Sequence, residues 1–325
     1  MLLEKTESQW ISGTAIAEKL GLTRAAVWKC IRQLEYDGYE IETSRRGYRL
    51  GPGSDAVSVN SLRRELGEDA DVFDPEVLAE VDSTNTYLKK KAAAAQHDGW
   101  LDGLRDWHTV IAACQSEGRG RLGRKFVSPP ETGLYMSVLL RRETATGQAA
   151  RITTIAAVAA CLAIEACTRE KAAIKWVNDI YVHGKKVCGI LTEASVNLET
   201  GGLDWAVMGI GLNVYEPREG FPEEIREIAG SIVRERQRDL RSRLAAAFLK
   251  EFRRICSDPE GSGYVDEYRR RSFLTGKEIR VISGDSTRLA RALDVDKECR
   301  LRVQYEDGTT ETLSSGEVSV RPIRS

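Results

Sequence analysis

Three glycines and three arginines share residues 118–124, in the sequence GRGRLGR. Glycine lets the backbone bend tightly and approach a ligand, and arginine offers planar pairs of hydrogen-bond donors that suit carboxylate and phosphate oxygens. Together the two residue types predict a loop that closes around an anionic ligand. A mobile arginine–glycine tail for nucleic acid is the alternative, but predicted strands on both sides favour a loop held by a scaffold.

Gly118, Gly120 and Gly123 also match the G-x-G-x-x-G fingerprint of nicotinamide dinucleotide sites. In that fold the third glycine begins a helix that crosses over to a parallel strand. Too few residues, two of them prolines, separate Gly123 from the predicted strand LYMSVLLR (134–141) for such a helix to form. The spacing therefore argues against a dinucleotide-binding oxidoreductase.

Small polar side chains stand at a predicted helix start within VDSTNTYLKK (81–90). Such side chains either cap the helix or turn their spare donors and acceptors toward a ligand, and the sequence leaves both uses open. The four residues are Asp82, Ser83, Thr84 and Asn85.

A third polar stretch, KWVNDIYVHGKKVCGILTEA, covers residues 175–194. We predict one strand over 173–182, a Gly-Lys-Lys turn, and a second, apolar strand. The simplest interpretation puts both lysines of the turn on a solvated hairpin tip, and the alternative is that they serve the same anion as the arginine loop. The polar residues are Lys175, Asn178 and Asp179 before the turn, and Lys185 and Lys186 in it.

The composition of the whole chain excludes several classes of protein. The 325 residues, 42% of them hydrophobic, suffice for two or three domains, and 48 basic against 49 acidic residues mean that any anion site comes from local clustering. Seven cysteines without a C-x-x-C pair and three scattered histidines fit neither a disulfide framework nor a zinc motif. The N-terminus lacks the apolar core of a signal peptide, and the longest fully apolar run, 155–164, is far shorter than the roughly 18 residues of a membrane span. We expect a cytoplasmic protein without a membrane segment.

Residues 12–50 predict a helix–turn–helix followed by a short basic hairpin, the arrangement of a winged-helix DNA-binding domain. Gly21 can end the first helix, Thr23 can cap the second, and Val27 and Ile31 recur at helical spacing toward the core. A small interaction module with a solvated basic face is the alternative. The expected DNA contacts are Arg24, Ala25, Lys29 and Arg32 on the second helix and Arg45 and Arg46 on the hairpin.

Three segments follow one another along the chain. The turn-rich GPGSDA (51–56) predicts a linker, and the mixture of strands and helices after it predicts a domain of catalytic size. The last fifty residues contain short strands only, with the hairpin signal Asp307-Gly308, and suggest a small β-barrel. The predicted divisions are 1–56, 57–272 and 273–325.

Four motifs together resemble the successive motifs of the biotin protein ligase family, in the family's order. They are DSTN (82–85), CQSEGRGRLGRKFVSP (114–129), KWVNDIYV with KKVCGILTE (175–193), and GIGLNV (209–214). A winged helix in front and a small β-domain behind resemble the bifunctional form, which is also the biotin operon repressor. The resemblance implies an α+β protein with a winged helix-turn-helix, a central mixed β-sheet with helices akin to class II aminoacyl-tRNA synthetases, and an SH3-like β-barrel.

The resemblance also implies the chemistry. Biotin and ATP, with Mg²⁺ neutralising the triphosphate, would give biotinyl-5′-AMP and pyrophosphate, and the biotinyl group would then pass to one lysine of a biotin carboxyl carrier protein. Operator DNA would be the second partner, bound by a homodimer that forms when the adenylate is present. No metal ligand among the side chains is implied.

The family's site residues carry over by motif position. The catalytic set would be Lys186, Arg121, Arg119 and Asp179, with Lys186 holding the biotin carboxylate and Asp179 acting on the incoming lysine. Biotin would contact Ser83, Thr84, Asn85, Gln115, Gly118, Arg119, Gly120, Arg121, Lys186 and Gly189. ATP would contact Arg121, Arg124, Phe126, Lys175, Asn178 and Asn213.

Two positions depart from the family's pattern. Phe126 stands where the family usually has Trp, which leaves a smaller surface for adenine stacking, and Val177 replaces the usual Pro. Two rivals remain open at this point. One is a non-catalytic winged-helix repressor whose middle domain senses a ligand such as a nicotinamide, and the other is a ligase whose N-terminal module has lost DNA binding.

Overall fold

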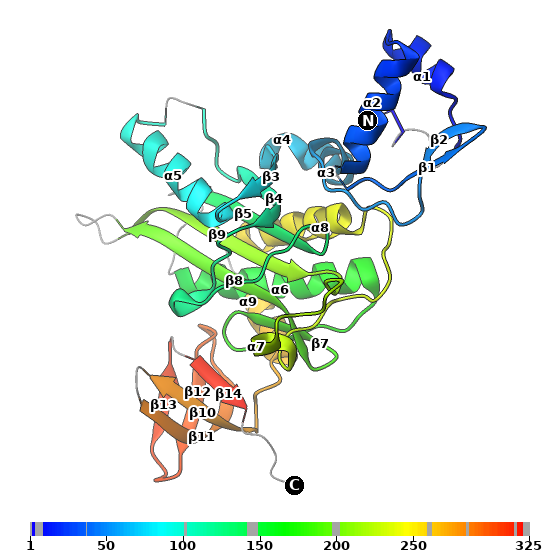
Figure 1. The fold of residues 1–325 in the computed structure, drawn as a ribbon. Helices are drawn as coiled ribbons and strands as arrows, with labels where there is room; N and C mark the ends of the chain where they lie inside the picture. Colours follow the sequence, from blue (N-terminus) through cyan, green and yellow to red (C-terminus); the bar gives the residue numbers. More distant parts are fainter. Residues whose placement is uncertain are drawn as a thin grey trace.

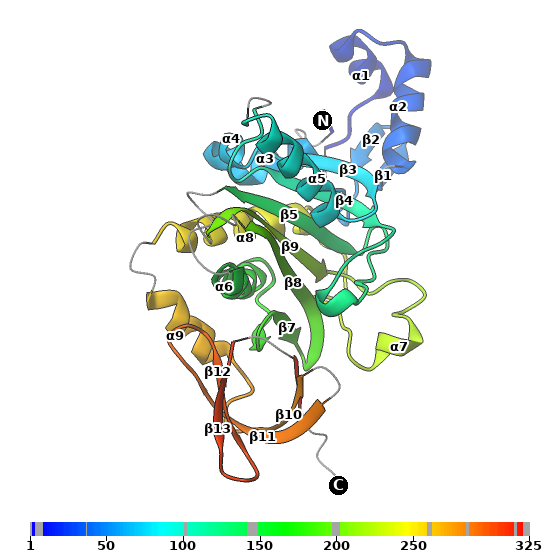
Figure 2. The same cartoon turned by 90° about the vertical axis from the view of Figure 1, so that its left-hand side faces the viewer.

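A computed structural model describes residues 2–3, 9–36, 38–100, 103–141, 149–196, 202–258, 262–283, 286–314 and 317–320. These residues form three parts in chain order: a small N-terminal domain, a large sheet covered by helices, and a C-terminal sheet (Figure 1). The first and last parts lie at opposite ends of the molecule in both ribbon views, with the large sheet between them (Figure 2).

The N-terminal domain has the predicted helix–turn–helix and hairpin. Helices α1 (Gly13–Leu20) and α2 (Arg24–Tyr36) are followed by the antiparallel strands β1 (Ile41–Ser44) and β2 (Gly47–Leu50). Gly21 ends α1 in the left-handed conformation (φ 64°), and the Thr23 hydroxyl accepts a hydrogen bond from the Ala26 amide at the start of α2. Ile16, Val27, Ile31 and Leu50 form a small buried core of their own.

The stretch between this domain and the large sheet is packed. Its composition predicts a linker, yet Ser54, Asp55 and Ala56 are buried, and the Asp55 carboxylate pairs with Arg241 of the large domain. The glycines and proline of residues 51–53 allow a turn, and the buried ion pair between Asp55 and Arg241 fixes this turn against the large domain.

The large sheet is mixed. Among the described residues seven strands lie in the order β3-β4-β5-β9-β8-β7-β6, with β3 and β4 parallel and the other neighbours antiparallel. In that spatial order they are Glu76–Val81, Thr109–Gln115, Gly133–Arg141, Leu203–Asn213, Lys185–Val196, Asp179–Val182 and Ala173–Lys175.

Helices cover both faces of this sheet. Alternation along the strands sends Val110, Leu139 and Val207 to the face of α5 (Thr84–His97), whose Leu88 and Ala92 complete a buried cluster. Their neighbours Ile111, Val138 and Met208 face the main core on the other side. That core is closed by α6 (Ala149–Thr168), α8 (Leu240–Cys256), α3 (Val59–Leu66) and α9 (Ser262–Arg271).

Helix α6 is apolar all round because it lies inside the protein. By length and composition it could cross a membrane, but 67% of its apolar window is buried against the sheet and neighbouring helices. Its burial accounts for the apolar run 155–164 as part of a folded core.

A second sheet forms the C-terminal part. Five strands of the described chain, in the order β13-β12-β11-β10-β14, pair antiparallel throughout. Asp307-Gly308 makes the predicted turn between β12 and β13, with Gly308 at φ 83°. The indole N–H of Trp176 in the large domain donates to the Cys299 carbonyl (2.9 Å), which fastens the two sheets together. The strands β10 to β14 are Glu278–Ser283, Ser286–Val295, Leu301–Tyr305, Thr310–Leu313 and Glu317–Val320.

The structure corrects two predictions around the lysine hairpin. The stretch 173–182 is two strands, β6 and β7, because Trp176 to Asn178 form a turn between them. The tip of the next hairpin is His183-Gly184, both at positive φ, so Lys185 and Lys186 begin strand β8. A lysine in the strand keeps a fixed direction, which a lysine on a solvated tip would not.

Several elements had no counterpart in the prediction. Strand β3 is half-exposed and carries two glutamates, while the short helices α4 (Ala70–Phe73) and α7 (Glu223–Arg226) have one turn each, too few residues for a periodic pattern. The remaining short turns are η2 (Gly67–Asp69) and η3 (Arg121–Gly123).

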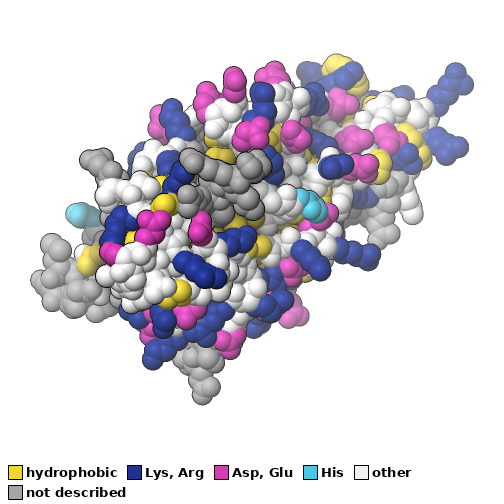
Figure 3. Space-filling model, turned by 90° about the horizontal axis from the view of Figure 1, so that it is seen from below, with side chains coloured by type: hydrophobic (Ala, Val, Ile, Leu, Met, Phe, Trp, Pro, Cys, Tyr) yellow, Lys and Arg dark blue, Asp and Glu magenta, His cyan; other side chains and the backbone are white. Residues whose placement is uncertain are grey.

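Charge on the surface is mixed, in line with the near balance of 48 basic and 49 acidic residues. The space-filling view from below shows lysine and arginine side chains interspersed with aspartate and glutamate over that face, with only small hydrophobic areas between them (Figure 3). Any strong positive field must therefore come from a local group of residues.

Phe252 of α8 anchors the main core, and replacing it tests that core. Its ring is fully buried, stacks on Phe248 (centroids 5.5 Å apart) and meets Trp107 edge-on at 5.7 Å. We expect Phe252→Ala to lower the free energy of unfolding by about 3–5 kcal/mol in a urea titration, since it leaves a cavity. Arg254→Ala, on the exposed side of the same helix, should change it by less than about 0.5 kcal/mol. Equal effects would contradict this assignment of the core.

Candidate active site

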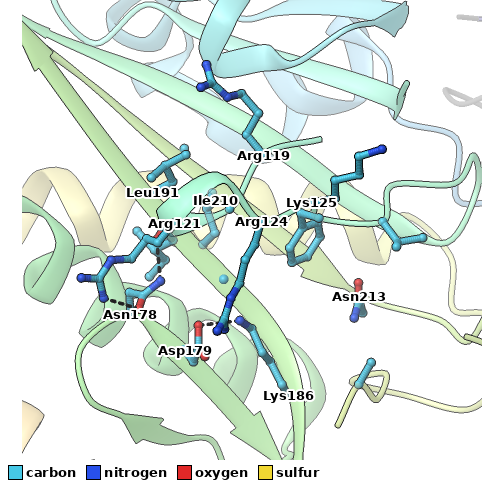
Figure 4. Close-up of a pocket in the computed structure, with 18 of the residues that line it drawn as sticks. Arg119, Arg121, Arg124, Lys125, Asn178, Asp179, Lys186, Leu191, Ile210 and Asn213 are labelled. Atoms are coloured by element: carbon cyan, nitrogen blue, oxygen red, sulfur yellow. Dashed lines mark hydrogen bonds and ion pairs between the residues drawn. The ribbon is translucent and has the colours of Figure 1, made fainter. Parts of the chain in front are cut away.

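A cavity of about 250 Å³ lies over the ends of β8 and β9, beneath the arginine–glycine loop (Figure 4). The loop after β4, the turn between β6 and β7, and the segment after β9 all contribute to its walls. Its described lining is Ser83, Thr84, Asn85, Gln115, Arg119, Gly120, Arg121, Leu122, Arg124, Lys125, Phe126, Val127, Lys175, Trp176, Asn178, Asp179, Lys186, Gly189, Ile190, Leu191, Gly209, Ile210, Gly211, Asn213, Phe221, Ile225, Ile228, Ala229 and Val318.

Two facing glycines form the floor of the cavity. Gly189 of β8 and Gly211 of β9 are register partners, and the ring of Phe126 lies over them. A methyl group on Gly211 would sit 2.6 Å from this ring, and one on Gly189 would sit 3.4 Å from it. The edge of Phe126 also meets Tyr135 with centroids 6.4 Å apart. Because neither glycine has a side chain, the Phe126 ring can lie directly on the backbone of the sheet.

A hydrogen-bonded polar cluster closes one end. The Gln115 side-chain carbonyl accepts from the Thr84 amide at 2.9 Å, and its amide group donates to the Ser128 hydroxyl at 2.8 Å. The hydroxyl of Ser137, at the buried centre of β5, bonds to the hydroxyl of Thr84 and to the side-chain amide oxygen of Asn85. Helix α5 begins at Thr84, and within the described chain Ser83 makes no capping hydrogen bond with its side chain. The polar side chains at this helix start are thus ordered by one another and face the cavity.

The arginine–glycine loop is folded as a tight hairpin. The Phe126 amide donates to the Gly118 carbonyl at 2.8 Å, and the Gly120 amide donates to the Arg124 carbonyl at 2.7 Å. A side chain on Gly118 would clash with the Phe126 carbonyl and lie 2.6 Å from the Ser128 hydroxyl, while Gly123 turns at φ 74°. Gly118 allows this close approach of the loop and is the one predicted biotin or ATP residue outside the described cavity lining.

The loop arginines point in different directions (Figure 4). Arg121 reaches across to the turn between β6 and β7 and donates to the Asn178 side-chain carbonyl at 3.1 Å. Arg124 extends toward the Asp179–Lys186 pair in this view. Arg119 turns to the opposite side, where its guanidinium lies 3.7 Å from Glu193. All three arginines line the cavity, with Arg121 bonded to the β6–β7 turn and Arg119 directed toward Glu193.

Lys186 and Asp179 form an ion pair in the cavity, with 2.6 Å between ammonium and carboxylate. Their side chains are 30% and 19% exposed, so water screens the pair and a ligand can reach both groups. The Lys186 backbone is bracketed by the segment after β9: its amide donates to the Ile228 carbonyl (2.8 Å), and its carbonyl accepts from Gly230 (2.9 Å). The direction of this lysine is thus set by contacts on both sides of its backbone.

Glu193 is the carboxylate beside Arg119. Burial by itself would raise the pKa of this carboxyl, but hydrogen bonds from Lys89 and Asn85, with the charge of Arg119 nearby, keep the pKa below its ordinary value. Glu193 is therefore an anion at neutral pH, and the negative charge explains why Arg119 leans away from the cavity.

The structure brings the three polar stretches of the sequence into one site. All predicted biotin and ATP residues except Gly118 line the described cavity, and the predicted DNA residues are exposed on α2 and on the β1–β2 hairpin. The sequence did not predict the apolar wall from the segment after β9. Phe221, Ile225 and Ile228 recur at helical spacing, but a proline and glutamates lie between them and α7 has only one turn, which is too short for a predicted helix. The sequence analysis also missed Val318, because nothing local ties the last strand to a site more than one hundred residues earlier.

The geometry also settles the dinucleotide question. Gly123 is followed by an irregular stretch that leads directly into β5, and β5 pairs antiparallel with β4. No crossover helix follows it in the described residues 124–133, so the glycines have no phosphate-binding helix of the nicotinamide type. A cation-lined cavity over a mixed sheet, behind a helix–turn–helix domain, defines an enzyme of anionic substrates joined to a DNA-binding module.

Comparisons with known proteins give the same class. Residues 77–213 match the Biotin/lipoate A/B protein ligase family, residues 1–49 match the HTH domain, and residues 274–321 match the biotin protein ligase C terminal domain. The bifunctional ligase/repressor BirA of Bacillus spizizenii is 35% identical over 234 residues, 71% of this chain and 68% of that protein. The biotin--[acetyl-CoA-carboxylase] ligase of Mycobacterium tuberculosis is 30% identical over 284 residues, 83% of this chain and 97% of that protein.

The fold agrees with a solved relative. A biotin protein ligase from Aquifex aeolicus, in complex with biotin and ATP, superposes with a TM-score of 0.62 at 26% identity, covering 76% of this chain and 98% of that one. The chain belongs to the biotin protein ligase family.

The contact between Gly209 and Asn85 offers a test of the site's packing. A methyl group on Gly209 would overlap the Asn85 side chain, so Gly209→Ala should lower the free energy of unfolding by about 1–3 kcal/mol. Gly263→Ala is the matched control, since nothing lies within 4 Å of its added methyl group. In a double-mutant cycle measured by urea titration, Asn85→Ala should cost less in the Gly209→Ala background than alone. Strictly additive effects would show that the two residues do not touch.

Proposed function

We propose that this protein activates biotin with ATP to biotinyl-5′-AMP and then transfers the biotinyl group to one lysine of a biotin carboxyl carrier protein. We further propose that it represses transcription of biotin synthesis or transport genes, with the adenylate as corepressor. The observation that carries the enzymatic half is that Lys186, Arg121 and the Thr84–Gln115 cluster line one cavity. Its relatives named as ligases and ligase/repressors support both halves.

Charge repulsion is the barrier that this cavity is suited to lower. The biotin carboxylate must attack the α-phosphorus of ATP, and two unit charges about 4 Å apart repel by roughly 4 kcal/mol at an effective dielectric near 20. Lys186 and Arg121 offer donors on two sides of the cavity, and Arg119 could close over the ligand when its anion outcompetes Glu193. The new bond joins the carboxylate oxygen to phosphorus, and pyrophosphate leaves with the electrons of the broken P–O bond.

Biotin and ATP need different surroundings. A ureido ring needs both donors and acceptors, and the Ser83, Thr84, Asn85 and Gln115 cluster supplies them. Adenine needs an aromatic or apolar surface, for which Phe126 is the nearest candidate, with Arg124, Lys175, Asn178 and Asn213 around the phosphates. We place biotin at the polar end and ATP toward Lys186 and Asn213.

Mg²⁺ would arrive as part of the substrate, bound to ATP. The described residues contain no group of three or more histidine, cysteine, aspartate or glutamate side chains that could hold a metal ion. Among the described residues of the cavity, Asp179 is the sole carboxylate. One carboxylate with phosphate oxygens and water fits the way Mg²⁺ accompanies nucleotides.

Asp179 suits the second step. Its carboxylate pairs with Lys186, and an anionic ligand that draws the ammonium away would leave the carboxylate available. Asp179 could then orient the amine of the carrier lysine and accept its proton while the amine attacks the acyl carbon and AMP leaves. No covalent enzyme intermediate is required, since the adenylate itself carries the activated acyl group.

The repressor half rests on the N-terminal domain. Arg24, Ala25, Lys29 and Arg32 are exposed along α2, and Arg45 and Arg46 are exposed on the hairpin, where a winged helix meets the major groove and the backbone. We assign residues 1–56 to this domain and its linker, 57–272 to catalysis and 273–325 to an SH3-like domain, with the central sheet akin to class II aminoacyl-tRNA synthetases. A cytoplasmic location, an adenylate-dependent homodimer and a palindromic operator complete the proposal.

Two substitutions test the role of the cations. We expect Lys186→Ala to reduce adenylate formation about 10²–10³-fold, because it removes a donor to the developing charge, and Arg121→Gly to release the adenylate faster. Mass spectrometry of a carrier domain after reaction with biotin and ATP measures the outcome as one added biotin. Lys171→Ala, at an exposed position, should leave activity unchanged. A wild-type protein that makes no adenylate but binds NADH would favour the nicotinamide-sensing repressor instead.

DNA binding makes a separate prediction. Each of Arg45→Ala and Arg46→Ala should weaken binding to the upstream region of the protein's own biotin genes and reduce the slope of log K against log salt by about 1, as expected for one lost phosphate contact. Fluorescence anisotropy at several salt concentrations, with biotin and ATP present, gives the slope. Arg63→Ala, an exposed residue of α3, serves as the control. Wild-type protein that shows no ligand-dependent binding would remove the repressor half and leave the ligase.

A further inference from the structure

A buried ion pair outside the cavity joins the interdomain stretch to the large domain. Asp55 is fully buried and Arg241, in the first turn of α8, is 3% exposed. The Asp55 carboxylate accepts from the Arg241 side chain (3.2 Å), from the Arg241 amide (2.9 Å) and from the Tyr215 hydroxyl (2.6 Å). The Asp55 carbonyl also accepts from the Arg241 guanidinium.

Such a pair is unexpected on grounds of stability alone. Removing two charges from water costs free energy that their attraction often only balances, and apolar residues of similar volume would serve as well. Burial in fact raises the pKa of Asp55 in spite of Arg241 and Tyr215 beside it. The arrangement therefore calls for a role that depends on direction, which hydrogen bonds supply and apolar contacts do not.

The partners of Asp55 stand at the two ends of one segment. Tyr215 lies two residues after β9, and Arg241 is the second residue of α8, to which the segment returns. The neighbouring Ser54 carbonyl accepts from the Asp239 amide at 3.1 Å. Residues 54 and 55 thus hold both ends of segment 216–238, although they lie about 160 residues before it in the chain.

That segment forms the apolar wall of the cavity and supports Lys186. Phe221, Ile225 and Ile228 line the cavity. The backbone of residues 228 and 230 bonds to both sides of Lys186, and the Ile232 amide donates to the Asn213 carbonyl at 2.9 Å. A shift of the segment would therefore move the lysine and one end of β9 together.

We propose that Asp55 is a positioning residue for Lys186, acting through the two fixed ends of segment 216–238, and that the stretch joining the DNA-binding domain thereby responds to occupancy of the cavity. The effect on biotin chemistry rests on the proposed function, whereas the positioning itself does not. Because coupling is reciprocal, a ligand that orders the segment must also stabilise the conformation of residues 51–56.

Tyr215→Phe is the informative variant, because it removes one hydroxyl and leaves the ion pair to maintain the fold. Tyr87→Phe is its matched control: the Tyr87 hydroxyl also donates to a carboxylate at 2.6 Å, that of Glu76, away from the segment. In the full-length protein without ligand, amide hydrogen exchange in 216–238 should become about tenfold faster in Tyr215→Phe. The lost hydroxyl bonds to the Asp55 carboxylate (2.6 Å) and also to the Gln237 backbone (3.3 Å) at the end of the segment. Tyr87→Phe should leave that exchange unchanged.

Activity supplies a readout that a general loss of stability would not produce. Tyr215→Phe should raise KM for biotin about tenfold with kcat altered less than about twofold, since the change loosens the site without removing a reacting group. Asp55→Asn should act in the same direction and more strongly. In the wild-type protein, biotin with ATP should slow exchange in 51–56, and this protection should be lost in Tyr215→Phe.

The outcomes separate the two proposals. Unchanged exchange in 216–238 for Tyr215→Phe would overturn the positioning role, whatever the protein catalyses. Faster exchange there, without ligand-induced protection of 51–56 in the wild type, would overturn the coupling to the linker. A wild-type protein without ligase activity would contradict the proposed function. Amide hydrogen exchange in 216–238, measured without ligand, would still decide whether Asp55 fixes the segment.

Discussion

The cavity exists because two neighbouring strands carry glycine at positions that are register partners. Gly189 and Gly211 face each other across β8 and β9, and Phe126 fills part of the space that their side chains would occupy. A methyl group on Gly211 would lie 2.6 Å from the ring and displace it, so the position of Phe126 over the sheet depends on this glycine. Glycine weakens a strand, and here the pairing of β5 and β8 on either side of β9 offsets that weakness.

The charges around the two glycines are arranged as exchangeable pairs. Lys186 pairs with Asp179, Arg121 bonds to Asn178 and Arg119 lies near Glu193, so each of these three cations has a polar partner. An anionic ligand then replaces partners instead of meeting bare charges, which reduces the desolvation that binding requires. The same exchange frees a carboxylate beside the ligand, and this links the first chemical step to the second.

The sequence predicted the residues of the site better than the segments between them. Motifs of small and charged residues, such as DSTN and GRGRLGR, are informative because a tight loop or helix start constrains residue type locally. The turn at Trp176 to Asn178 was missed because Val177 and its apolar neighbours read as a continuous strand. Phe221 and Ile225 were not predicted, because they lie in a stretch rich in proline and glutamate where α7 has a single turn. Asp55 lies in a turn-rich stretch, and its burial depends on a helix far along the chain.

The contribution of Val318 to the cavity wall makes the C-terminal sheet part of the site. The lining begins near residue 83 and is completed by the last strand of the C-terminal sheet, which docks on the large domain through contacts such as the one between Trp176 and Cys299. The relative position of the two sheets therefore sets the width of the cavity on this side, and a movement of the C-terminal sheet away from the large domain would remove part of the wall.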